Sequence, residues 1–304
     1  MKLLVATDQA FTLTPAKLYA LTEAVPDLEV VSKAAASLTA ADAEGVSILL
    51  GSPDPALLAQ MPTLDWLHLT TPDFQPYADL TRYANRKIVV TKSPFGESAA
   101  ELVLALIFSV AQGLAPNRPA DFEPLKIAGS AALVAGLGDL GQKVALRLHQ
   151  NGCRLSALRR NILEKPRFLS WVGTLRQYPE AAGVSIAVNC LPLTAETQNF
   201  WNAESLRLLP PGGIFIHAGQ DGTVDAEALA QAIGRNGLRG AAYDGPLPQQ
   251  HPLRNAENTW VTPSLAVQDR EGNLRRIYDR FVQLLPLFLA NRLLPDQLQF
   301  FRGY

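Results

Sequence analysis

Short apolar runs alternate with helix-like segments in two separate stretches of the chain. In the first stretch the segment TPAKLYALTEAVP, with Thr14 as an N-cap and Pro15 in the first turn, lies between two such runs. This alternation predicts parallel sheets covered by helices, so we expect an α/β protein with two doubly wound domains. The apolar runs of the first stretch are KLLVAT, LEVVS, VSILLG, DWLHLT and KIVVT, and those of the second are AALVAG, CRLSAL, SIAVNCL, GIFIHA, LRGAAYD and TWVTPS.

The length of 304 residues suits two domains that each bury a core of their own. The C-terminal segment EGNLRRIYDRFVQLLPLFLANRLLP has helical spacing, and we expect it to pack back on the first domain. The sequence therefore predicts a discontinuous first domain, residues 1–95 with 275–304, and a second domain, residues 96–274.

A strongly apolar helix is predicted over residues 97–114. Ser98 and Glu101 have the spacing of a capping box at its start. Because the segment is apolar on nearly every face, it should be buried against its own domain or against a second subunit. The sequence thus favours a homodimer.

Composition argues against several classes of function. The 27 lysines and arginines nearly cancel the 28 acidic residues, and no basic run would follow a nucleic acid. Cys153 and Cys190 form no CxxC pair, and the four histidines show no metal-ligand spacing. No segment has the length of a membrane span or the form of a signal peptide. We expect a cytoplasmic protein that uses no metal and binds neither nucleic acid nor membrane.

The segment VAGLGDLG ends the first apolar run of the second stretch and opens a helix. Its three glycines have the spacing of a dinucleotide-binding turn, in which a pyrophosphate meets the helix N-terminus. A tight strand-to-helix turn without a ligand is the alternative. The expected cofactor contacts in this loop are Gly136, Gly138, Asp139, Leu140 and Gly141.

Two arginines follow the next apolar run, where such folds contact the adenine ribose. Arg159 lies 23 positions after Gly136, and Arg160 follows it. An acidic residue there would bind a free 2′-hydroxyl, whereas a guanidinium fits a 2′-phosphate. The pair therefore favours NADP over NAD, unless both arginines are solvated loop residues.

Beyond the glycine loop the chain resembles the D-isomer-specific 2-hydroxyacid dehydrogenases, which include phosphoglycerate dehydrogenases and glyoxylate/hydroxypyruvate reductases. The resemblance covers most of the chain. It implies a flavodoxin-like substrate domain, a Rossmann cofactor domain, a nicotinamide cofactor between them and a homodimer built on the long helix. The segments that carry it are LPLTAETQNFWNAESLRLLPPGGIFIHAG, VDAEALAQAI, LRGAAYD, PLPQQHPL and VTPSLA, in that order.

The resemblance also implies a second set of cofactor contacts. Pro192 and Asp244 are open to another interpretation, because both residue types are common at strand ends. The implied contacts are Leu191 and Pro192 against the cofactor, Thr197 near its phosphates, Ala218 and Gly219 at the nicotinamide ribose, and Asp244 at the carboxamide.

The family's reaction depends on an arginine that binds the substrate carboxylate and on a histidine held by a glutamate. At the arginine position this chain has Gln220, and at the histidine position it has Ser264. The glutamate falls in a missing segment, since only Gly245 separates Asp244 from PLP. Ordinary 2-keto acid reduction should therefore be weak or lost.

The loop LTTPDFQ points the same way, because Pro72 has no N–H to offer a carboxylate and Asp73 would repel one. His217, at a strand end, and Lys92, in VTKSPFG, are the candidates to supply a proton instead. Each also has an ordinary interpretation, His217 as a structural residue and Lys92 as a solvated one.

Two functions are consistent with these residues. The first is an oxidoreductase that prefers NADP and acts on an unidentified small molecule other than a simple 2-keto acid. The second is a non-catalytic protein that binds NADP(H) and has a regulatory or sensor role. A structural relic with no ligand is a third possibility, and the intact glycine loop argues against it.

Overall fold

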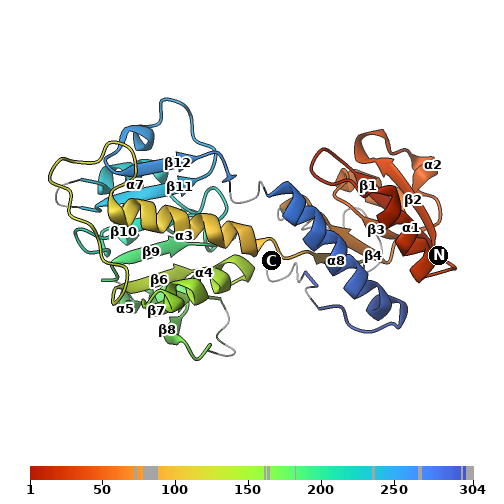
Figure 1. The fold of residues 1–304 in the computed structure, drawn as a ribbon. Helices are drawn as coiled ribbons and strands as arrows, with labels where there is room; N and C mark the ends of the chain where they lie inside the picture. Colours follow the sequence, from red (N-terminus) through yellow and green to blue (C-terminus); the bar gives the residue numbers. More distant parts are fainter. Residues whose placement is uncertain are drawn as a thin grey trace. The chain divides into compact units, whose positions relative to one another are not determined.

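The computed structural model describes residues 1–71, 74–77, 88–160, 162, 165–181, 183–234, 237–265, 269–295 and 297–298. The chain divides into two compact units, one made of Met1–Phe95 with Asp269–Tyr304 and the other of Gly96–Gln268. Each unit contains one sheet with helices beside it (Figure 1).

The first unit has five parallel strands in the order β2-β1-β3-β4-β5, the strand order of a flavodoxin-like sheet. Its first helix starts as expected, because the Thr14 side chain accepts a hydrogen bond from the Lys17 N–H. The strands are β1 Lys2–Thr7, β2 Glu29–Ala34, β3 Val46–Leu50, β4 Trp66–Leu69 and β5 Val89–Lys92, and the helices are α1 Pro15–Ala24, α2 Ala40–Ala43 and α8 Arg270–Leu289.

The second unit has seven parallel strands in the order β12-β11-β10-β9-β6-β7-β8. The order reverses direction between β6 and β9, as in a Rossmann sheet, and ligands bind at such a switch point. The strands are β6 Ala131–Ala135, β7 Arg154–Leu158, β8 Leu169–Gly173, β9 Ile186–Asn189, β10 Ile214–His217, β11 Gly240–Asp244 and β12 Thr259–Thr262, and the helices are α3 Gly96–Gln112, α4 Asp139–Gln150, α5 Tyr178–Ala181, α6 Ala203–Leu206 and α7 Ala226–Ala232.

Each sheet is buried on both faces, which explains why its strands are near-continuous apolar runs. In the second unit, Ile214 and Ile216 of β10 pack with α3 and α4, whereas Phe215 packs on the other face around Trp201. In the first unit, α8 covers one face with Phe281 stacked on Trp66 of β4. Burial on alternate sides therefore fixes which side chains of each strand point into which core.

Three expectations about elements need correction. The boundary expected at 274/275 falls inside α8, because the units divide between Gln268 and Asp269 and the helix starts at Arg270, with Asp269 as its N-cap. The strand β8 was not expected, because its sequence LSWVG follows a loop without a helix pattern. The helix α3 begins at Gly96, so Ser98 lies inside its first turn and is not the N-cap.

Packing within its own unit explains more of the apolar character of α3 than the sequence suggested. Its exposed positions form one strip, and its other faces pack on α4 and on β10, β11 and β12 of the same unit. Phe108 keeps 37% of its surface exposed. The exposed strip consists of Glu97, Glu101, Ala105, Phe108 and Gln112.

No helix in the described ranges has the length and apolar content needed to cross a membrane. The described residues also contain no group of three or more histidine, cysteine or acidic side chains placed to hold a metal ion.

Candidate functional site

The cofactor residues expected from the sequence follow five strands of one parallel sheet at its carboxyl edge. The backbone ladder continues past the strand ends, with Gly136 N–H bonded to the Leu158 carbonyl at 2.9 Å and Ala218 N–H to the Asn189 carbonyl at 3.0 Å. Parallel strands place their carboxyl ends side by side. The residues brought to this edge are Gly136 after β6, Arg159 after β7, Leu191 after β9, Ala218 after β10 and Asp244 at the end of β11.

The three glycines of the loop meet different surroundings. Gly136 has a φ of 93° and would place a Cβ 2.5 Å from the Cys190 carbonyl oxygen, so glycine is required there. A Cβ on Gly141 would lie 1.8 Å from the Gly136 oxygen. A Cβ on Gly138 would meet nothing within 4 Å, although this residue caps the N-terminus of α4. Close packing requires glycine at 136 and 141. Gly138 leaves space at the N-terminus of α4, where helices bind anions.

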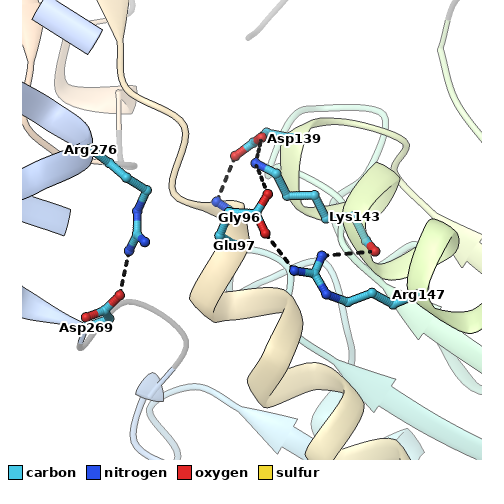
Figure 2. A network of polar contacts seen from close by, with 7 residues as sticks. All are labelled: Gly96, Glu97, Asp139, Lys143, Arg147, Asp269 and Arg276. Atoms are coloured by element: carbon cyan, nitrogen blue, oxygen red, sulfur yellow. Dashed lines mark hydrogen bonds and ion pairs between the residues drawn. The ribbon is translucent and has the colours of Figure 1, made fainter. Parts of the chain in front are cut away.

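Asp139, the first residue of α4, makes contacts that the sequence did not suggest. Its Oδ2 accepts the Gly96 N–H at 2.7 Å and its Oδ1 pairs with Lys143, so the carboxylate caps α3 from α4 (Figure 2). Beside it, Arg147 binds Glu97 at 2.6 Å, and this hydrogen bond is the main reason that the pKa of Glu97 is lowered. Asp139 therefore holds the glycine loop to the start of α3.

Leu140, the next residue of the loop, is partly buried and packs against the core that α3 and α4 share. It supports the loop from inside the unit.

Arg159 and Arg160 follow β7, the strand next to β6. The Arg159 N–H continues the ladder to the Gly173 carbonyl at 2.9 Å, so its backbone is held by β8. Arg160 lies 3.5 Å from a Glu196 oxygen, with both side chains more than a third exposed. An ion pair that exposed is worth about 0–1 kcal/mol, which a phosphate could easily replace.

The loop after β9 is braced by its own hydroxyl groups. Thr197 Oγ1 accepts the Thr194 N–H at 2.7 Å and donates to the Pro192 carbonyl at 2.5 Å, and Leu191 is buried. A Cβ on Gly219 would lie 2.7 Å from the Leu191 oxygen, so the loops after β9 and β10 are in close contact. Thr197 therefore shapes this loop.

Gln220 joins the same two loops. Its side-chain oxygen accepts the Leu193 N–H at 2.6 Å, and its own N–H donates to the Leu191 carbonyl at 2.9 Å. An arginine side chain has no acceptor and could not receive the Leu193 N–H.

Asp244 and Ser264 are connected through the loop that follows β12. Asp244 Oδ1 accepts hydrogen bonds from the Leu265 N–H at 2.7 Å and from the Thr262 hydroxyl at 2.5 Å. Ser264 lies between those two residues with a φ of 53°, in the left-handed region. The Asp244 side chain is buried, with 6% exposed, and these two hydrogen bonds support the loop on which Ser264 lies.

His217 is fully buried at the end of β10, and its tautomer follows from its neighbours. Asn189 accepts the Leu191 N–H with its oxygen and donates from Nδ2 to His217 Nδ1 at 2.9 Å and to Thr223 Oγ1 at 2.8 Å. The His217 Nδ1 is therefore the acceptor, and its proton is on Nε2. That N–H has no hydrogen-bond partner among the described residues and lies 3.9 Å from an Asp221 oxygen.

Asp221 and Tyr243 were missed from the sequence, and only the position of Asp221 directly after Gln220 could have drawn attention to it. The Tyr243 hydroxyl donates to Asp221 Oδ1 at 3.5 Å, and its ring lies 4.4 Å from the imidazole of His217. Burial, together with the charge of Asp221, raises the pKa of Tyr243 to about 12. Tyr243 therefore stays a protonated donor beside this carboxylate.

The structure gives less support to a catalytic role for the remaining residues considered. Lys92 ends β5 in the first unit, where its ammonium lies 4.8 Å from the centre of the Phe74 ring. Pro72 and Asp73 lie outside the described residues. Burial raises the pKa of the Cys190 thiol to about 12, so this residue is no nucleophile at neutral pH.

Comparison with known proteins matches residues 107–266 to a family model described as the NAD-binding domain of D-isomer specific 2-hydroxyacid dehydrogenase. A glyoxylate/hydroxypyruvate reductase of Arabidopsis thaliana is 26% identical over 261 residues, which cover 80% of this chain and 79% of that protein. A D-3-phosphoglycerate dehydrogenase of Mycobacterium leprae is 28% identical over 235 residues, 72% of this chain and 44% of that protein.

Solved structures extend the likeness over both units. A D-isomer specific 2-hydroxyacid dehydrogenase of Xanthobacter autotrophicus Py2, in complex with NADPH and MES, has a TM-score of 0.83 and 26% identity and covers 100% of this chain and 99% of its own. An NADPH-dependent glyoxylate/hydroxypyruvate reductase of Sinorhizobium meliloti, in complex with citrate, has a TM-score of 0.73 and 25% identity and covers 98% of each chain. The expected fold of two doubly wound α/β domains is confirmed.

Proposed function

Because the chain belongs to the D-isomer specific 2-hydroxyacid dehydrogenase family, we propose that it is an oxidoreductase that prefers NADP and reduces simple 2-keto acids weakly or not at all. The observation that carries the proposal is the open space at Gly138, beside the N-terminus of α4, with Arg159 and Arg160 after the neighbouring strand. When bound, NADPH supplies a hydride.

In this proposal each loop at the carboxyl edge has one task. The glycine loop and the N-terminus of α4 hold the pyrophosphate, and Arg159 with Arg160 holds the 2′-phosphate. Leu191, Pro192, Ala218 and Gly219 line the path of the dinucleotide, with Asp244 at the carboxamide. Thr197 acts indirectly, by bracing the loop after β9.

The predicted loss of 2-keto acid reduction is supported by Gln220 and Ser264, which the resemblance aligns with the family's arginine and histidine. Gln220 is neutral, and its oxygen is already engaged by a backbone N–H. Ser264 cannot serve as a general acid near pH 7 without a partner.

The replaced catalytic positions also support a second candidate function, that of a non-catalytic protein that binds NADP(H) as a regulator or sensor. A broad panel of carbonyl compounds assayed with NADPH separates the two, since only the oxidoreductase turns over.

The cofactor preference is tested by fluorescence titration with NADPH and NADH. We expect NADPH to bind at least several-fold more tightly and Arg159→Asp to narrow the difference. Arg154→Asp, at the exposed opposite end of the same strand, is the matched control and should leave the difference intact. Equal affinities for the two cofactors in the unmodified chain would refute the NADP assignment.

We further propose that the protein works as a homodimer in the cytoplasm, on a small-molecule substrate that is still to be identified. Cys153 and Cys190 are both free thiols, which supports a reducing compartment. The partly exposed Phe108 on α3 supports self-association.

A further inference from the structure

Charge is unevenly distributed along the carboxyl edge of the second sheet. The β7 end carries Arg159 and Arg160, whereas the loops after β10 and β11, residues 218–225 and 245–251, contain no lysine or arginine. Asp221 lies in the first of these loops. One half of the edge therefore suits phosphates, and the other half offers a carboxylate with no basic residue in its own loops.

The Asp221 side chain is accessible and held in place. It is 51% exposed, its Oδ1 accepts the Tyr243 hydroxyl, and no lysine or arginine of the described residues forms an ion pair with it. The Nε2 of His217, which is fully buried and makes no hydrogen bond within the described part of the chain, lies 3.9 Å from the same oxygen. The Tyr243 hydroxyl donates to Oδ1 of this carboxylate, and the His217 Nε2 lies near the same oxygen at a distance too long for a hydrogen bond.

Neither donor neutralises the charge of Asp221. The Nδ1 of His217 faces the Asn189 amide N–H and acts as an acceptor, which leaves Nε2 as the donor nitrogen of the ring. Tyr243 keeps its proton because burial and the nearby carboxylate raise its pKa to about 12. Asp221 counts among the acidic residues of the chain, and neither of these neighbours brings a positive charge to offset its carboxylate.

From this arrangement we propose that Asp221 binds the positive group of the substrate, an aliphatic ammonium, where the family's ordinary substrates present a carboxylate. The inference rests on the proposed function, since it takes the β10 and β11 end of the edge as the substrate end. A ligand ammonium gains a charge-assisted hydrogen bond to Asp221. A ligand carboxylate faces a like charge there and is rejected.

The test uses three small probes with a short aliphatic chain and head groups of different charge: propylammonium, propan-1-ol and propionate. The melting temperature of the full chain is measured with each probe, with and without saturating NADP⁺, and potassium chloride controls for ionic strength. Propylammonium at about ten times its dissociation constant should raise the melting temperature by about 3 °C. Propan-1-ol, propionate and potassium chloride should not.

Two substitutions assign the effect to Asp221. Asp221→Asn should abolish the response to propylammonium, and Glu257→Gln, which removes an exposed carboxylate ahead of β12 at the opposite edge of the sheet, should retain it. Gly245→Ala keeps the charge but would place a Cβ 2.4 Å from Asp221 Oδ1, so it should weaken the response.

The inference is overturned if propionate or potassium chloride stabilises the protein as much as propylammonium, or if Asp221→Asn responds like the unmodified chain. Failure of the proposed function is a different result, in which NADPH does not bind in the fluorescence titration. The arm without NADP⁺ still reports on Asp221 in that case.

Discussion

Gly138 and Gly141 are three residues apart, but the surroundings that favour glycine differ between the two positions. The absence of a side chain at Gly141 lets α4 pack against the turn. A Cβ at Gly138 would meet no atom of the described residues within 4 Å. We therefore expect Gly141→Ala to prevent stable folding, because its Cβ has no room. Gly138→Ala should leave the melting temperature within about a degree and weaken NADPH binding by about tenfold or more, which is about 1.4 kcal/mol.

Thermal unfolding and fluorescence titration of the two glycine variants check this pair. If Gly138→Ala binds NADPH as tightly as the unmodified chain, the dinucleotide does not approach the loop where the spacing indicates.

His68 makes the stability of the first unit depend on pH. It is fully buried under α8, with its ring nitrogens 2.7 Å from Thr91 Oγ1 and 2.9 Å from Ser93 Oγ. Burial, with the charge of Arg280, lowers the pKa of His68 from 6.5 to about 3. Below pH 6.5 the imidazole therefore binds a proton in the unfolded chain but stays unprotonated in the folded chain. The free energy of unfolding is largest above pH 6.5 and falls as the pH drops toward 3.

The expected loss is about 1.4 kcal/mol per pH unit below 6.5, or about 2 kcal/mol at pH 5. Urea unfolding between pH 5 and pH 7 measures it, in a range where few carboxylates titrate. His68→Gln should lose this pH dependence, and His149→Gln, at an exposed position, should keep it. A slope unchanged by His68→Gln would show that another group titrates.

At the scale of elements, side chains of α4 bind the first turn of α3 within the second unit (Figure 2). Asp139 accepts the Gly96 N–H and pairs with Lys143. Asp139→Ala should cost about 1–2 kcal/mol, as the loss of a helix cap does, and Asp139→Asn should cost less because it keeps an acceptor. Glu97→Gln should cost under about 1 kcal/mol, because this carboxylate is half exposed.

Urea denaturation of these three variants ranks the contacts. An Asp139→Ala protein as stable as the unmodified chain would mean that the carboxylate contributes nothing to holding α3.

The elements that could be predicted are those whose signal is local. The strands of both sheets other than β8, the glycine loop and the cap at Thr14 follow from apolar runs and short motifs. The cap of α3 could not be predicted, because its acceptor, Asp139, is 43 residues from Gly96. Asp221 was missed for the same reason, since its significance depends on Tyr243 and His217 across neighbouring strands.

The roles of the cofactor residues show the same limit. The family resemblance implied cofactor contacts at Thr197 and Asp244, but it could not show that both side chains brace loops. Gln220 was expected to replace a substrate-binding arginine, and its bond to the Leu193 N–H depends on the loop after another strand.

At the scale of the whole molecule, self-association is the first question. Most of the apolar surface of α3 is covered by its own unit, but Phe108 on this helix and Leu114, two residues beyond its end, stay 37% and 72% exposed. We expect a homodimer by light scattering at micromolar concentration, and Phe108→Glu should shift the mass toward the monomer. A monomeric mass for the unmodified chain would remove the proposal.

The central claim is that the chain keeps the dinucleotide site and has lost ordinary 2-keto acid chemistry, and the turnover of such acids tests it most directly. The measurement is NADPH oxidation with saturating cofactor and millimolar glyoxylate, hydroxypyruvate or pyruvate. A positioned general acid contributes about 10²–10⁴ in rate, so we predict a turnover number at or below about 0.1 s⁻¹. A value of about 10 s⁻¹ or more, ordinary for an enzyme, would contradict the account.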